Sequence, residues 1–146
     1  MLLILTVLVG LSVPQFGRTF RHLELQVFAS EVANRLTYAG RRAVARGEVL
    51  RVQFDVPGRR YWLTRARPAP AAATFERVPD RFGRAVAVPG SISLVSRTRA
   101  VTFYPDGRAD RFEMVISDGG QTAYRLVTNV RTGRVTLVPG HERARR

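Results

Sequence analysis

The chain of 146 residues contains no cysteine and no lysine, and its only histidines are His22 and His141. Without cysteine it can form neither a disulfide framework nor a thiolate metal site. It also lacks the H-E-x-x-H, G-x-G-x-x-G and Walker-type patterns that hold zinc, dinucleotides and nucleoside triphosphates. Asp106 and Asp110 could form an acid–base or Ca²⁺ pair around a P-D-G turn, but aspartates in turns usually serve backbone geometry. The sequence therefore predicts no enzyme, no cofactor and no metal site.

All 24 basic residues are arginines, against 11 acidic residues, and the formal net charge is +13. A field of this sign attracts phosphates and anionic lipid headgroups. The arginines are nevertheless scattered through the predicted strands and loops, and a genome rich in arginine codons would also exclude lysine. Scattered, solvated charge is the favoured interpretation. A basic tail, H-E-R-A-R-R, ends the chain and contains Arg143, Arg145 and Arg146.

The N-terminal run Leu2–Val13 is apolar except for Thr6 and Ser12, which are both small. The run is about a dozen residues long, whereas a helix that spans a bilayer needs about 20. It is too short to cross a membrane by itself and too apolar for an ordinary exposed terminus.

After Pro14 the apolar residues recur at steps of three or four, which places them on one stripe of a helix. We predict one helix from Leu2 to about Arg46, bent near Pro14 and Gly17 and ended by Gly47. Such a helix is longer than a small domain is wide, so its first third must project. The residues predicted to seat the helix on a sheet are Leu25, Phe28, Val32 and Leu36.

From Glu48 onward the apolar period is two, which is typical of strands. A hairpin is predicted from "EVLRVQFDV", the turn "PGRR" and "YWLTR". Residues 67–73 have the composition of a loop, and residues 74–88 show only a weak apolar pattern. "SISLVS" and "AVTFY" follow, and we predict that "AVTFY" continues through the P-D-G turn as a hairpin with "RFEMVIS". "TAYRLVT" and "RVTLV" complete at least six strands. The predicted fold class is α+β, with one antiparallel sheet or a pair of sheets packed on the helix stripe.

Two segments together resemble a known family. The apolar "LLILTVLVGLSVPQF" leads into an amphipathic helix that ends "AGRRAVARGEVLRVQFD". The later "VTFYPDGRADRFEMVISDGGQTAYRLVTNVRTGRVTLV" holds an apolar strand, a P-D-G turn, a hairpin and T-G-R-V before the last strand. In this order, over essentially the whole chain, these features resemble the GspH/FimT family of minor pseudopilins, which are type IV pilin-like proteins.

The resemblance implies a structural protein rather than an enzyme. Members are minor subunits of the type II secretion pseudopilus or of type IV pili, and they assemble beside other pilin-like subunits. The N-terminal helix is then expected in the bacterial inner membrane, as a single pass, or in the filament core, with the β-rich domain in the periplasm or on the filament. The residues expected to pack in the membrane or filament are Leu2, Leu3, Ile4, Leu5, Val7, Leu8, Val9, Leu11 and Val13, with Pro14 at the bend.

Family precursors begin with a basic leader and a cleavage site followed by F-T-L-x-E, and no such segment precedes Met1. We expect that the leader and the first mature residues are missing, because adding about eight residues would extend the apolar run to about 20, enough to cross a bilayer. The expected segments are a membrane or filament helix at 1–17, a helix packed on the domain at 18–47, the β-rich domain at 48–139 and the basic tail at 140–146.

Four alternatives remain from the residues. A DNA-binding minor pilin acting in DNA uptake would use the arginine-rich surface and the tail residues Arg143, Arg145 and Arg146 to contact phosphates. A secretory signal peptide lacks its basic start and its small-x-small cleavage site here. An ordinary buried helix would have to explain why residues 2–13 are apolar on every face. A single-strand stacking platform in "RRYWLTR" is also conceivable, but aromatics in alternating strands more often fill a sheet core.

Overall fold

The computed structural model describes residues 2–67, 74–120 and 122–141, with residues 2–19 and 141 described as backbone alone. One helix, α1 (Leu2–Arg46), precedes nine strands and one short 3₁₀ helix, η1 (Arg81–Gly83). The strands are β1 (Leu50–Asp55), β2 (Arg60–Arg67), β3 (Thr74–Arg77), β4 (Val86–Ala87), β5 (Ser93–Ser96), β6 (Ala100–Phe103), β7 (Glu113–Ser117), β8 (Thr122–Thr128) and β9 (Val135–His141).

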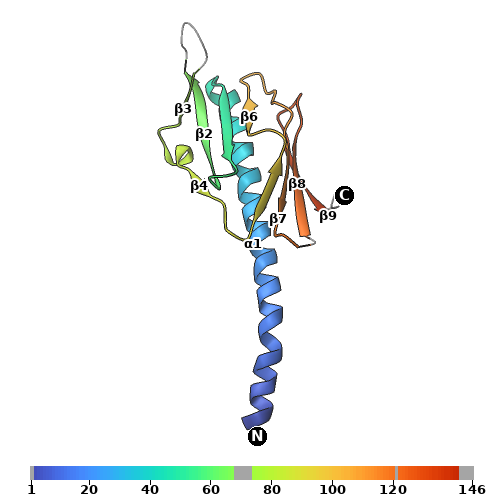
Figure 1. Ribbon diagram of the computed structural model, residues 1–146. Coiled ribbons are helices and arrows are strands. Elements are labelled where there is room, and N and C mark those ends of the chain that lie inside the picture. The colour runs from blue at the N-terminus through green and yellow to red at the C-terminus, as the bar shows by residue number, and fades with distance from the viewer. Residues whose placement is uncertain (1, 68–73, 121, 142–146) are drawn as a thin grey trace.

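The helix α1 has 45 residues and is therefore about 68 Å long at 1.5 Å per residue. Its predicted bounds are confirmed: it begins at Leu2, continues through Pro14 and ends at Arg46, just before Gly47. The N-terminal half projects away from the strands, as predicted, and only the C-terminal half lies among them (Figure 1). Within the described chain, no helix has the length and apolar character needed to cross a membrane. The bend at Pro14 stays a prediction.

The strands form two antiparallel sheets, which confirms the α+β class and selects the two-sheet alternative. Sheet A has the strand order β3-β2-β1-β6, with β4 pairing with one end of β2. Sheet B has the order β5-β7-β8-β9. The predicted hairpin of β1 and β2 is present, with Val52 opposite Leu63 and Phe54 opposite Tyr61. Successive residues of β1 alternate between buried and half-buried, as the sequence period predicts.

The core lies where the C-terminal half of α1 meets both sheets. The helix contacts β1 and β6 of sheet A and β7, β8 and β9 of sheet B. Each sheet presents one apolar face to the helix because successive strand residues point to opposite sides. The largest fully buried side chains include Tyr61, Phe103, Phe112, Leu25, Leu36, Leu50, Leu63, Ile92, Met114, Ile116, Leu126 and Val32.

One predicted hairpin is wrong. β6 pairs with β1 in sheet A, whereas β7 pairs with β5 and β8 in sheet B. The P-D-G turn does reverse the chain, since Tyr104 N–H donates to the carbonyl of Arg108, but the pairing stops at a single bridge between Phe103 and Ala109. The chain then crosses to the other sheet, where the N–H of Phe112 donates to Thr128 Oγ1. A turn motif specifies a reversal of direction and not the sheet that the next strand joins.

Candidate assembly interface

The helix α1 carries an exposed apolar stripe at the base of the domain. Phe20, Leu23 and Val27 are 72%, 53% and 65% exposed. At 3.6 residues per turn these three residues share one side of the helix, opposite the side that Phe28 and Val32 bury. We call Phe20, Leu23 and Val27 the exposed stripe. They directly follow the part of α1 that is described as backbone alone, which includes every residue of 2–14 expected to pack in a membrane or filament.

The opposite side of α1 seats the helix on the sheets. Leu25, Val32 and Leu36 are fully buried, and Phe28 is 4% exposed. The ring of Phe28 meets the ring of Tyr61 of β2 edge to face, with centroids 6.2 Å apart. Such aromatic pairs contribute about 0.5 to 1.5 kcal/mol beyond the area that they bury. The four residues predicted to hold the helix therefore lie in the hydrophobic core.

A charged clamp fixes the upper part of α1 to the segment around η1. The guanidinium of Arg42, only 4% exposed, lies 2.7 Å from an Asp80 carboxylate oxygen and 3.4 Å from one of Glu48. Partial burial disfavours the Asp80 carboxylate, but hydrogen bonds from Arg42 and from the Phe82 N–H outweigh it and lower the pKa of Asp80 below its ordinary value. Beside this clamp, Arg35 donates to the carbonyl of Phe82 over 3.1 Å.

The outer face of sheet A carries arginines stacked on aromatic rings. The guanidinium carbons of Arg60 and Arg77 lie 5.5 and 4.9 Å from the ring centroid of Trp62, and that of Arg51 lies 3.8 Å from the centroid of Phe75. We call these five residues the arginine–aromatic face. The alternating pattern of "RRYWLTR" assigns its aromatics to the core. That holds for Tyr61, which is fully buried, but the half-buried Trp62 alternates with it and faces outward.

The residues considered for catalysis or metal binding have separate partners. Asp106 accepts hydrogen bonds from the N–H and the guanidinium of Arg108, which lower its pKa, whereas Asp110 accepts one from the Tyr104 hydroxyl. In residues 2–67, 74–120 and 122–141 there is no group of three or more potential metal ligands. The tail residues Arg143, Arg145 and Arg146 lie outside the described residues.

The chain resembles solved structures of two pilin-like proteins over most of its length. It is similar to the minor pseudopilin EpsH of the type II secretion system of Vibrio cholerae, with a TM-score of 0.64 and 16% identity, over 81% of this chain and 97% of that one. It is also similar to the type IV minor pilin FimU of Pseudomonas aeruginosa, with a TM-score of 0.58 and 21% identity, over 81% of this chain and 90% of that one. These likenesses establish the pilin fold.

The sequence itself places the chain in a family. No curated protein matches it at a significant level. The family described as type II transport protein GspH matches residues 29–133, which is well over half of the chain and covers the upper helix and every strand except β9. The chain therefore belongs to the GspH family and has the pilin-like fold that its sequence predicts.

Proposed function

We propose that the chain is a structural subunit of a bacterial pilin-like filament, either a type II secretion pseudopilus or a type IV pilus. Its helix α1 inserts among the helices of neighbouring pilin-like subunits and into the inner membrane, and its two-sheet domain lies in the periplasm or on the filament. The observation that carries this proposal is that α1 has apolar residues outside the hydrophobic core, first in the sequence of residues 2–13 and then in the exposed stripe.

Covering the exposed stripe would add free energy to a protein contact. Fully burying an apolar side chain of this size contributes about 1.5 to 3 kcal/mol. Given the exposed fractions of Phe20, Leu23 and Val27, covering them would contribute about 3 to 6 kcal/mol before the cost of association. A helix of a neighbouring subunit is the partner that we propose for the stripe, because helices pack through residues three and four apart, which is the spacing of Phe20, Leu23 and Val27.

The test is complementation in the bacterium that makes the chain. A strain lacking the gene should lose or reduce its pilin-like filaments or its type II secretion, and the wild-type chain should restore them. L23D/V27D should fail to restore assembly, because it places charge on the exposed stripe. H22D/Q26D changes two exposed residues of the same helix turns and should restore it. Full complementation by L23D/V27D would contradict the proposal.

The arginine–aromatic face supports a second candidate function, which is DNA binding in DNA uptake. Guanidinium groups held over aromatic rings lose less freedom when they bind phosphate, and Arg51 is held further by a hydrogen bond of 3.0 Å to Thr102 Oγ1. The tail residues would add three more positive charges. Binding of this kind weakens steeply as salt increases, because it releases counterions.

This second candidate is tested by fluorescence anisotropy with a labelled single-stranded oligonucleotide at several salt concentrations. R51A/R77A and R143A/R145A/R146A should each weaken binding. The slope of the logarithm of the binding constant against the logarithm of the salt concentration should become shallower by about one unit for each phosphate that the variant no longer binds. R97A/R99A removes two exposed arginines from the turn before β6 and serves as the matched control for R51A/R77A. If all these variants bind as tightly as the wild type, neither surface contacts DNA.

A further inference from the structure

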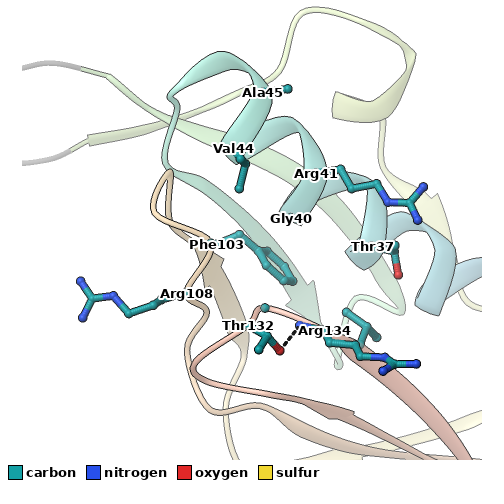
Figure 2. A pocket seen from close by; sticks show the side chains of 12 residues that line it. Thr37, Gly40, Arg41, Val44, Ala45, Phe103, Arg108, Thr132 and Arg134 are labelled. Atoms are coloured by element: carbon teal, nitrogen blue, oxygen red, sulfur yellow. Dashed lines mark hydrogen bonds between the residues drawn. The ribbon is translucent and has the colours of Figure 1, made fainter.

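A cavity of about 540 Å³ opens between the C-terminal end of α1 and two turns of the domain. The turns are β6–β7, with Arg108, and β8–β9, with Arg134, and the helix contributes Arg41 and Val44 (Figure 2). These turns are far apart in sequence but lie side by side, because the carbonyl of Val130 accepts a hydrogen bond from the Ala109 N–H. The cavity lies at the opposite end of the domain from the exposed stripe.

Two glycines let the elements around this cavity pack closely against one another. A Cβ at Gly40 would lie 3.2 Å from Cδ1 of Phe103, so the helix approaches β6 closely only because Gly40 has none. Gly133 has a φ of +67°, and a Cβ there would lie 2.8 Å from the carbonyl oxygen of Gly107. The turn before Arg134 is also fixed by Asn129, whose side-chain oxygen accepts hydrogen bonds from two backbone N–H groups. Close packing at the two glycines and the hydrogen-bonded turn therefore hold the helix end and the two turns together around the cavity.

The cavity has unbalanced positive charge on one side. The side chains of Arg41 and Arg134 extend toward the same side, whereas Arg108 extends to the other side (Figure 2). Arg108 is paired with Asp106 at 2.6 Å. In the part of the chain that the structure describes, neither Arg41 nor Arg134 forms a salt bridge, and no residue that lines the cavity is acidic. Two exposed guanidinium groups thus face an opening without a counter-charge.

We propose that this cavity binds an acidic segment of another protein, with a carboxylate held between Arg41 and Arg134. Guanidinium groups bind carboxylates through two parallel hydrogen bonds, which gives both strength and direction. An apolar side chain next to that carboxylate packs on Val44, which is 55% exposed. The partner is a protein of acidic surface and not a second copy of this chain, which carries the same +13 charge.

The cavity fits a peptide better than a nucleic acid. Single-stranded nucleic acids are bound by grooves in which bases stack on exposed aromatic rings. Among the described residues that line this cavity, the only aromatic ring belongs to Phe103, which is 1% exposed and offers no face for stacking. This site is distinct from the exposed stripe, so its occupation and the assembly of α1 can succeed or fail separately.

The test uses the full chain in a non-ionic detergent and a fluorescein-labelled peptide, acetyl-Asp-Leu-Glu-Asp-Phe-Glu-amide. A neutral twin carries Asn for Asp and Gln for Glu. The wild type should bind the acidic peptide, and the neutral twin should bind at least about tenfold more weakly, since removing each charge-assisted hydrogen bond costs about that factor or more. R41A/R134A should weaken binding of the acidic peptide by a similar factor, whereas R97A/R99A should change it less than about twofold.

A second variant keeps the proposal testable if R41A/R134A folds poorly. V44E adds a carboxylate at the opening without removing an arginine, and it should abolish binding; V138E, at an exposed valine of β9, is its control. The proposal is overturned if the acidic peptide does not bind, if the neutral twin binds equally, or if R97A/R99A weakens binding as much as R41A/R134A. It is also overturned if an oligonucleotide binds more tightly than the peptide and depends on Arg41 and Arg134.

Discussion

Two sides of α1 carry apolar residues, but their surroundings differ. On one side Leu25, Val32 and Leu36 are fully buried against the two sheets, and with Phe28 they form the buried stripe. On the opposite side, at the base of the domain, Phe20, Leu23 and Val27 remain more than half exposed. The buried stripe therefore stabilises the domain, whereas nothing in the described chain covers the exposed stripe. If the exposed stripe serves assembly, as we propose, substitutions on the two sides of the helix should separate stability from assembly.

The largest effect is expected from charge on the buried side of the helix. V32D/L36D would bury two carboxylates among apolar side chains, which costs several kcal/mol each unless they protonate. A domain of this size is stable by only about 5 to 15 kcal/mol, so the double variant should lose its cooperative thermal transition in circular dichroism. L23D/V27D makes the same change on the exposed stripe and should melt within a few degrees of the wild type. Equal melting temperatures for the two variants would contradict the distinction between the buried and the exposed side of the helix.

A smaller effect is expected from the clamp above the buried stripe. D80N leaves the guanidinium of Arg42, only 4% exposed, without its closest carboxylate, and we expect a loss of about 1 to 3 kcal/mol in urea unfolding.

The Arg42–Asp80 pair also predicts how the free energy of unfolding depends on pH. Because the pKa of Asp80 is lowered in the folded state, its contribution is full above the ordinary aspartate pKa of about 4 and is lost as the pH falls through the folded value. Asp106, whose pKa is also lowered, adds to the acid loss of stability in both proteins. The difference in stability between wild type and D80N should therefore shrink below pH 4. A difference that stays constant down to pH 2 would rule out the charged clamp.

The smallest effect is expected at Tyr61, which faces Phe28 of the buried stripe. Its hydroxyl is buried and has no hydrogen-bond partner among the described residues, and burial raises its pKa. Tyr61→Phe removes this unsatisfied group and keeps the ring, so it should leave stability unchanged or raise it by up to about 1 kcal/mol. A clear loss of stability in the same urea measurement would mean that a bound water satisfies the hydroxyl.

Much of the fold can be predicted from the sequence because its signals are local. The helix bounds follow from helical spacing and from Gly47, and strict alternation identifies β1. The sequence does not identify β3 and β4, because they lie at the margin of sheet A, where no residue of either strand is fully buried and the apolar pattern fades. The pairing of β6 with β1 rather than β7 depends on contacts distant in sequence, which a turn motif does not encode.

The candidate surfaces are harder to predict. Phe20, Leu23 and Val27 have the same spacing as core residues, and only the position of the domain along α1 reveals that nothing in the described chain covers them. The outward direction of Trp62 depends on the register of β2. The cavity near Arg41 and Arg134 exists only because two turns and a helix end converge in space.

The most direct test of the account is photo-crosslinking from the helix in cells that assemble the filament. p-Benzoylphenylalanine replaces either Leu23, on the exposed stripe, or His22, an exposed neighbour that points to another side of α1. The account predicts that Leu23 gives abundant crosslinks to another pilin-like subunit, identified by mass spectrometry, and that His22 gives far fewer. Equal yields from the two positions, or no pilin-like subunit among the products from Leu23, would contradict it.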